Sequence, residues 1–237
     1  MSNTWFRFKQ FGIEQEQCAM KVTTDACIQG AWTPLPQKPA HVLDIGTGTG
    51  LLSLMLAQRN EQLSIDAVEY DAKAAQQAAA NVAASPWPSR IRVAHADIRQ
   101  YSVQETYDII ICNPPFFSAS LLGDTPSRNM ARHDVSLTRE ELLSAVAAML
   151  SEKGYCSLLL PYTEYQLWRP LAATYGLYEQ QSLHVAHKPG AAVKRVISIL
   201  AKEPNDNTTA ILLTIKDMNN NYTLQFRELL GDFYLDL

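Results

Sequence analysis

The sequence has few cysteines, no long apolar run and no excess of positive charge. Its four cysteines form no CxxC pair, so we predict neither a disulfide framework nor a zinc site, and we expect no metal. No apolar stretch approaches the roughly 18 to 20 residues that span a bilayer, and the first residues lack the basic-then-apolar order of a signal peptide. We therefore expect a cytoplasmic protein without a membrane partner, and no feature predicts an obligate protein partner.

The formal net charge of −4 argues against a protein that binds nucleic acid through a uniformly basic surface. A local basic patch remains compatible with this charge. Basic residues gather near the start, after residue 113 and late in the chain: Arg7, Lys9, Lys21, Arg128, Arg132, Lys188, Lys194 and Arg195. A scattered set of this kind is as easily an ordinary solvated surface.

From residue 41 onward, short apolar runs alternate with helical patterns, which is typical of a parallel sheet covered on both faces. We predict an α/β fold with a doubly wound, mostly parallel, seven-stranded sheet. The expected strands are 41–45, 64–68, 91–95, 108–112, 154–160, 183–187 and 194–201, and the expected helices are 51–59, 72–84, 138–150 and 164–175. Thr138 and Glu141 form a capping box at the start of one helix.

Two segments lie outside this rhythm. Residues 1–40 predict a small N-terminal extension, a strand or hairpin with a helix, that covers the cofactor site of a domain formed by residues 41–237. A further strand at 209–215 and a closing helix at 222–234 end the chain. Residues 117–137 lack periodicity, and a loop of that length inside a domain is usually functional.

A glycine-rich turn follows the first predicted core strand, in the order Asp44-Ile-Gly46-Thr-Gly48-Thr-Gly50. Such turns occur in nicotinamide, flavin and nucleotide binders alike. The spacing here is GxGxG, however, whereas the dinucleotide fingerprint is GxGxxG. The carboxylate of Asp44 would repel a pyrophosphate and suits a ligand that carries an ammonium group.

Acidic residues also follow the next two strands. Glu69 ends the second strand, where a carboxylate can accept hydrogen bonds from both ribose hydroxyls of an adenosine, and Asp97 follows the third strand, within reach of an adenine amine. Any one of the three acidic residues Asp44, Glu69 and Asp97 alone is better explained as a helix N-cap. Together they predict an adenosine site without a phosphate site, which favours S-adenosylmethionine.

This constellation resembles the class I S-adenosylmethionine-dependent methyltransferases over residues 41 to about 200. The resemblance implies a Rossmann-like fold and S-adenosyl-L-homocysteine as product. It assigns Asp44, Gly46, Gly48 and Gly50 to the methionine end of the cofactor, Glu69 to the ribose and Asp97 to the adenine.

The fourth strand ends in Asn113-Pro114-Pro115-Phe116, which resembles the Asn-Pro-Pro-aromatic motif of methyltransferases that modify planar nitrogens. Acceptors on the two protons of an NH₂ group, the Asn113 side chain and the Pro114 carbonyl, would aim the nitrogen lone pair at the methyl group. Phe116 can stack on the base. The resemblance makes Asn113, Pro114 and Phe116 catalytic candidates, with Asn113 also beside the cofactor.

The motif alone does not choose between adenine N6, guanine N2 of rRNA and the N5 amide of a protein glutamine. The N-terminal segments 8–13 and 18–32 resemble the bacterial tRNA1(Val) (adenine-37-N6)-methyltransferases, which act beside the anticodon. This resemblance implies a tRNA anticodon loop as partner. It adds Lys21 and Asp25 to the cofactor site, although Asp25 is as readily explained as a helix cap. Arg128 and Arg132 become candidates for tRNA phosphate contacts.

Four competing functions fit less well. A glutamine methyltransferase usually carries a sizeable helical N-terminal domain, and a guanine-N2 rRNA enzyme often carries a second, degenerate half; the sequence shows neither. The GxGxG spacing disfavours a nicotinamide oxidoreductase. A non-catalytic adenosine-binding module would have no need of the Asn113 motif.

Overall fold

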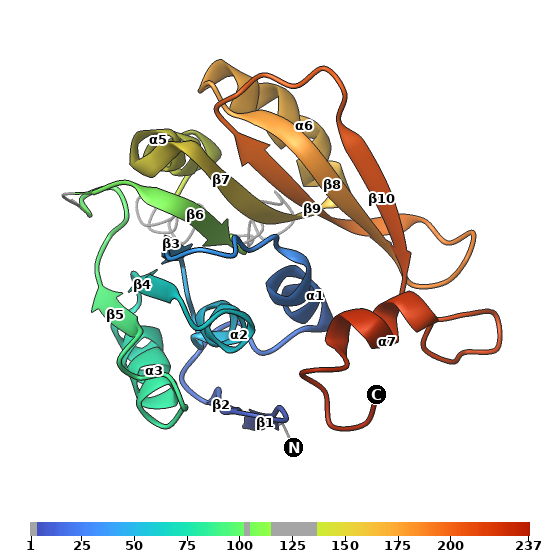
Figure 1. Ribbon diagram of the computed structural model, residues 1–237, viewed down its shortest axis with the longest axis horizontal. Coiled ribbons are helices and arrows are strands. Elements are labelled where there is room, and N and C mark those ends of the chain that lie inside the picture. Colours follow the sequence, from blue (N-terminus) through green and yellow to red (C-terminus); the bar gives the residue numbers. More distant parts are fainter. Residues whose placement is uncertain (1–3, 102–104, 115–136) are drawn as a thin grey trace, which may run out of the picture.

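The computed structural model describes residues 4–101, 105–114 and 137–237. Its centre is an eight-stranded sheet in the order β10-β8-β9-β7-β6-β3-β4-β5 (Figure 1). The strands are β3 (Ala40–Ile45), β4 (Leu63–Glu69), β5 (Ile91–His95), β6 (Tyr107–Cys112), β7 (Leu150–Pro161), β8 (Tyr178–Ala186), β9 (Val193–Ala201) and β10 (Thr209–Thr214). The sheet contains the seven predicted strands and one more, because the C-terminal strand β10 pairs with β8 at the edge.

One strand of this sheet runs against all the others. β9 is antiparallel to both β7 and β8, and every other pairing is parallel. The reason is the short connection of residues 187–192 between β8 and β9, which allows a hairpin but is too short for the crossover that a parallel pair requires. The first residues of β9 therefore lie at the edge where the other strands end.

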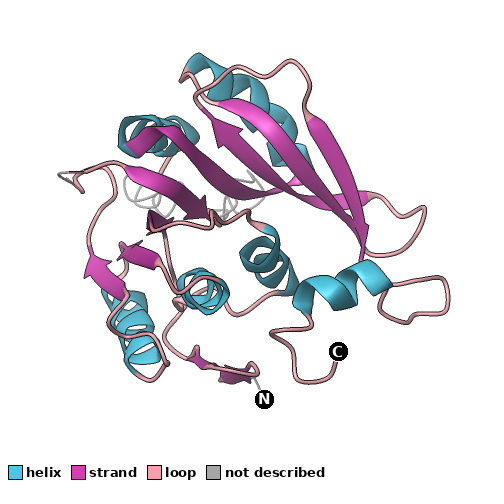
Figure 2. Ribbon diagram, viewed as in Figure 1, coloured by secondary structure: helices cyan, strands magenta, loops and turns pink. Residues whose placement is uncertain are grey.

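Helices cover both faces of the sheet, as Figure 2 shows. They are α2 (Leu51–Arg59), α3 (Ala72–Ala83), α5 (Arg139–Met149) and α6 (Tyr162–Thr174). Side chains of β6 alternate between two cores: Ile109 and Ile111 join one, while Ile110 and Cys112 join the other, which contains residues of α5 and α6. This alternation explains why β6 reads as an unbroken apolar run, since both of its faces are buried.

The N-terminal residues form the expected hairpin and helix: β1 (Trp5–Arg7), β2 (Gly12–Glu14) and α1 (Thr24–Trp32). Helix α1 packs against α2, and Gly30 makes this approach possible, because a Cβ atom there would lie 2.7 Å from the sulfur of Met55. Helix α1 also contacts the C-terminal helix α7 (Leu224–Leu230) (Figure 1). The extension thus joins the same core as the rest of the chain.

Two helix starts show how local chemistry sets the boundaries. The capping box predicted for α5 is confirmed, because the Thr138 hydroxyl accepts from the Glu141 amide and the Glu141 carboxylate accepts from the Thr138 amide. Helix α7 is shorter than the predicted 222–234, because Thr223 caps it. In the described part of the chain, no helix combines the length and apolar character needed to cross a membrane.

Candidate active site

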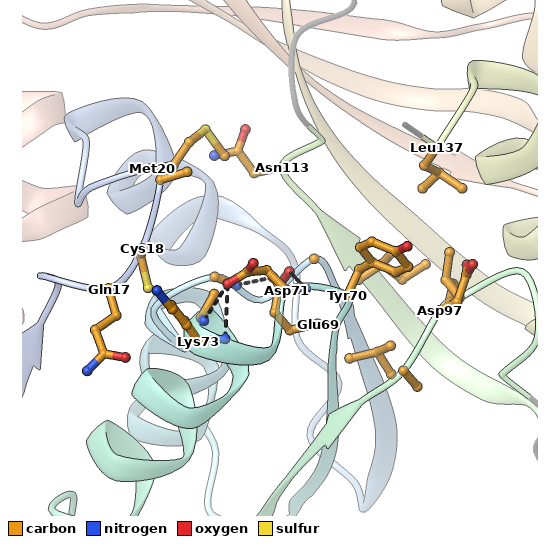
Figure 3. Close-up of a pocket in the computed structure, with 18 of the residues that line it drawn as sticks. Gln17, Cys18, Met20, Glu69, Tyr70, Asp71, Lys73, Asp97, Asn113 and Leu137 are labelled. Carbon is orange, nitrogen blue, oxygen red and sulfur yellow. Dashed lines mark hydrogen bonds between the residues drawn. The ribbon is translucent and has the colours of Figure 1, made fainter. Parts of the chain in front are cut away.

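A cavity of about 490 Å³ lies where β3, β4, β5 and β6 end (Figure 3). Its walls come from four parts of the chain: the extension, the glycine turn, the segments after β4 and β5, and the end of β6. The lining residues are Gln17, Cys18, Ala19, Met20, Ile45, Gly46, Gly48, Val68, Glu69, Tyr70, Asp71, Lys73, Ala74, Ala96, Asp97, Ile98, Arg99, Asn113 and Leu137. The volume is in the range of small-molecule cofactor sites.

The glycine turn forms one wall of the cavity. Gly46, Gly48 and Gly50 all have positive φ angles, of 69°, 56° and 82°, which other residues rarely adopt. A Cβ atom at Gly46 would meet no atom within 4 Å, and one at Gly48 would meet only the Gly46 carbonyl at 4.0 Å. The turn therefore leaves open space for a ligand against its backbone. Gly50 faces Ala78 of α3 and does not line the cavity.

Asp44 lies beneath this turn, fully buried, and not in the cavity wall. One of its carboxylate oxygens accepts three hydrogen bonds: from the Thr47 hydroxyl at 2.6 Å, the Ser53 hydroxyl at 2.7 Å and the Ser53 amide at 3.2 Å. Burial raises the pKa of Asp44 to about 6, although these hydrogen bonds act in the opposite direction. In the structure Asp44 fixes the shape of the turn from below.

Glu69 joins two of the cavity walls. Its carboxylate accepts from the Gly48 amide at 2.9 Å and from the Asp71 amide at 2.9 Å, and it faces the cavity. The sequence left open whether Glu69 is a helix N-cap. The structure gives that role to Asp71, which accepts from the amides of Lys73 and Ala74 at the start of α3. Two hydrogen bonds thus fix the position of the Glu69 carboxylate at the cavity wall.

Asp97 also lines the cavity, beside an arginine that the sequence reasoning missed. The shortest contact between Arg99 and Asp97 is 2.6 Å, and this guanidinium lowers the pKa of the Asp97 carboxyl. The carboxylate is therefore charged at neutral pH and can accept hydrogen bonds. Asp97 and Arg99 are two residues apart in the sequence, and this spacing could have predicted their ion pair.

Asn113 lies directly after β6, which β3 separates from β4 and β5 in the sheet, and it lines the cavity. It is half-buried, and its Oδ1 atom is buried without a hydrogen-bond partner among the described residues. The preceding residue is held by Gln29 of α1, whose side chain donates to the carbonyls of Cys112 at 3.0 Å and Ser157 at 3.1 Å. Pro114 is buried. Phe116, Arg128 and Arg132 lie outside the described residues.

The other two predicted residues, Lys21 and Asp25, do not line the cavity. Asp25 is in the first turn of α1, which Thr23 caps, and its carboxylate forms an ion pair with Arg195 of β9 at 3.1 Å. Burial raises the pKa of Asp25, and Arg195 opposes that shift. The extension reaches the cavity instead through Gln17, Cys18, Ala19 and Met20. The last three lie in the segment 18–32 that carries the family resemblance, but no site role was predicted for any of the four.

These residues fit S-adenosylmethionine. The cavity offers open space along the glycine turn, carboxylates at Glu69 and Asp97, and apolar surface from Ile45, Val68 and Ile98. Asn113 lines the same cavity, and its Oδ1 atom is a buried acceptor without a partner among the described residues. Together with the doubly wound sheet, they define a class I S-adenosylmethionine-dependent methyltransferase.

Comparison with known proteins gives the family. Residues 31–151 match the model of the methyltransferase small domain. A tRNA1(Val) (adenine(37)-N6)-methyltransferase of Bacteroides fragilis (strain YCH46) is 43% identical over 240 residues, covering 100% of both chains. One of the same name from Pseudoalteromonas translucida is 42% identical, covering 98% of this chain and 99% of its own. The chain belongs to the tRNA1(Val) (adenine(37)-N6)-methyltransferase family.

Solved structures agree on the fold. A predicted O-methyltransferase from Agrobacterium tumefaciens superposes with a TM-score of 0.68 at 17% identity, over 88% of this chain and 96% of that one. A putative RNA methyltransferase from Pyrococcus horikoshii gives a TM-score of 0.57 at 17% identity, over 79% of this chain and 88% of that one. The predicted class I methyltransferase fold is confirmed.

Proposed function

We propose that this protein transfers a methyl group from S-adenosylmethionine to N6 of adenosine 37 in tRNA1(Val) and releases S-adenosyl-L-homocysteine. Relatives that carry this name match the chain from end to end at 42–43% identity. The structural observation that carries the proposal is the carboxamide oxygen of Asn113. It is buried and lacks a partner in the described part of the chain, and Asn113 lines the same cavity as the glycine turn.

Methyl transfer to an exocyclic amine requires mainly that the protein align the nitrogen with the methyl group. The cofactor supplies an electrophilic methyl group when bound. An exocyclic amine has its lone pair delocalised into the ring, so acceptors on both of its protons, Asn113 Oδ1 and the Pro114 carbonyl, direct the lone pair out of conjugation. As the new C–N bond forms and the S–C bond breaks, the nitrogen loses a proton to solvent. Positioning therefore supplies most of the acceleration, and we propose no metal cofactor.

The residue roles follow from their places around the cavity. We propose that Glu69 binds the ribose and Asp97 the adenine amine, while Gly46 and Gly48 face the methionine end. Residues 1–40 act as the extension that covers the cofactor site of the domain formed by 41–237. The four other predicted cofactor residues do not line the cavity: Asp44, Gly50, Lys21 and Asp25. We propose indirect roles for three of them, with Asp44 and Gly50 shaping the turn and Asp25 holding helix α1.

The tRNA partner binds through its anticodon loop, and the protein is cytoplasmic in this proposal. A loop base is easier to splay out of its stack than a paired base. The target adenine must be extruded to reach the cavity. We propose that Phe116 stacks on it and that Arg128 and Arg132 contact phosphates.

Nucleoside mapping by mass spectrometry tests the proposal directly. The purified protein is incubated with S-adenosylmethionine and a tRNA1(Val) transcript, and a transcript with guanosine at position 37 is the matched control. We expect one N6-methyladenosine at position 37 in the first transcript and none in the control. Methylation of guanine N2 in rRNA, or of a glutamine amide, with no modification of the tRNA would overturn the assignment.

A further inference from the structure

The reversed strand β9 brings basic residues to the edge of the sheet where the cavity opens. In the strand register, Cys112 of β6 pairs with Leu158 of β7, and Pro161 of β7 pairs with Arg195 of β9. With strands about 4.8 Å apart, Lys194 and Arg195 begin β9 only two strands, or about 10 Å, to one side of the strand that presents Asn113. A parallel strand would place its first residues at the opposite edge.

Two further lysines extend this line. Lys188 is the second residue after β8, and Lys216 is the second residue after β10, where its amide donates to the His187 carbonyl at 2.9 Å. Strand β10 is four strands from β6, so Lys216 lies on the order of 20 Å from the Asn113 strand. We call Lys188, Lys194 and Lys216 the basic edge.

The charge of this edge contrasts with that of the opposite one. Near the basic edge, the described acidic residues include Asp217, Asp25 and Glu164, of which Asp25 is paired with Arg195 and Glu164 with Arg139. At the other ends of the same strands, carboxylates predominate: Glu152 at the start of β7, Glu203 after β9 and Asp206 before β10. The only lysines at those strand ends, within the described ranges, are Lys153 and Lys202, and Lys202 pairs with Glu152 at 3.1 Å.

The three lysines of the basic edge also differ in their exposure and in their side-chain contacts. Lys194 is exposed and Lys188 is half-buried, and neither forms an ion pair with a described carboxylate. Lys216 lies over the ring of Tyr222, with its Nζ atom 5.2 Å from the ring centroid, which fixes the direction of its side chain. A protein with a net charge of −4 thus keeps a row of cations beside its cavity.

We propose that the basic edge binds the sugar-phosphate backbone of the tRNA, along the nucleotides that flank the extruded base and continue into the anticodon stem. The inference rests on the proposed function and adds the surface on which the RNA lies. Lysines are suited to this task because they contact phosphates as point charges without reading sequence. Arg195 has a different role, since it holds α1 through Asp25.

The test compares two double variants with the same change in charge. Lys188→Glu with Lys194→Glu alters the basic edge, and Lys38→Glu with Lys153→Glu alters exposed lysines at the opposite edge. We measure tRNA binding by filter retention at several salt concentrations, KM for tRNA and for S-adenosylmethionine, and the thermal unfolding of both proteins.

We expect the basic-edge variant to bind tRNA at least tenfold more weakly and to show a slope of log Kd against log salt that is lower by about one to two, as lost phosphate contacts require. Its KM for S-adenosylmethionine and its melting temperature should match those of the wild type. Unchanged tRNA affinity, or an equal loss in the control pair, would overturn the inference while leaving the proposed function intact. If the wild-type protein itself neither binds nor methylates tRNA, both fail.

Discussion

The side-chain amide of Asn81, on helix α3, donates a hydrogen bond to the carbonyl of Thr49 at 2.9 Å. The same side chain accepts from the Glu14 amide at 2.9 Å and donates to the Glu14 carbonyl at 2.8 Å. Asn81 is buried, so these bonds are shielded from water. One residue thus fastens both the N-terminal hairpin and the glycine turn to α3.

Replacing Asn81 should weaken both the fold and cofactor binding. Asn81→Ala leaves buried backbone groups of Glu14 and Thr49 without partners, so we expect the free energy of unfolding to fall by about 1–3 kcal/mol. Binding of S-adenosyl-L-homocysteine, measured by calorimetry, should weaken because the glycine turn loses a support. Gln58→Ala is the control, since its bond to the Asp232 carbonyl joins other elements. Equal cofactor affinity in the two variants would contradict the prediction.

A methyl group added to the glycine turn should block the cofactor. Gly46 and Gly176 both have φ near 70°, and at both positions a Cβ atom would meet no other atom within 4 Å. Alanine at either position costs about 1–2 kcal/mol in backbone strain. Only at Gly46 does the methyl enter the cavity. We expect Gly46→Ala to lose cofactor affinity in titrations and Gly176→Ala to retain it, while denaturation shows similar destabilisation of both.

The pKa of Asp44 gives the protein a measurable pH dependence. Because burial raises this pKa to about 6, the folded protein keeps the Asp44 proton up to about pH 6, whereas the unfolded chain releases it near pH 4. The stability that this group contributes is therefore complete below pH 4 and is lost as the pH rises through 6.

Asp44→Asn should remove that loss, because an amide does not ionise and can keep its oxygen in place for the bonds from Thr47 and Ser53. Relative to wild type, the variant should gain up to about 3 kcal/mol in unfolding free energy between pH 4 and pH 7. Urea denaturation at both pH values measures the difference. A difference between the two proteins that does not change with pH would show that folding leaves the pKa of Asp44 unchanged.

Asn113→Ala should separate catalysis from cofactor binding. Loss of the Oδ1 acceptor should lower kcat by two or more orders of magnitude, as found when one positioned polar group is removed from an active site. The affinity for S-adenosyl-L-homocysteine should stay within a few fold, because the glycine turn and Glu69 are untouched. Single-turnover methylation measures the loss in rate, and calorimetry measures the affinity for S-adenosyl-L-homocysteine. A large loss of cofactor affinity would contradict the proposal that Asn113 accepts a hydrogen bond from the target amine.

The sequence predicted those parts of the site that follow directly from strand order. Gly46, Glu69, Asp97 and Asn113 each follow a strand, and parallel strands bring their carboxyl ends to one edge, so their meeting at the cavity was foreseeable. The roles of single residues were harder to predict. Asp44 also lies near the end of a strand, yet its side chain does not line the cavity. It lies beneath the glycine turn, where the hydroxyls of Thr47 and Ser53 donate hydrogen bonds to it.

Contacts between distant parts of the chain could not be predicted. Gln17 to Met20 reach the cavity because Gln15 and Asn81 hold the segment before them, and the Gln15 side chain accepts from the Val22 amide at 2.8 Å. The ion pair between Asp25 and Arg195 likewise depends on the reversal of β9. Neither periodicity nor a motif encodes such pairings, which arise only when the tertiary fold is complete.

The hairpin and helix at the start of the chain are held by residues that are synthesised after them. Glu14 is held by Asn81, Asp25 by Arg195, and the Lys9 amide donates to the carbonyl of Phe233 at 2.8 Å. A ribosome makes these three residues before it makes the partners that hold them. The N-terminal wall of the cofactor cavity can therefore be held by all of these contacts only once Arg195 and Phe233 have been synthesised.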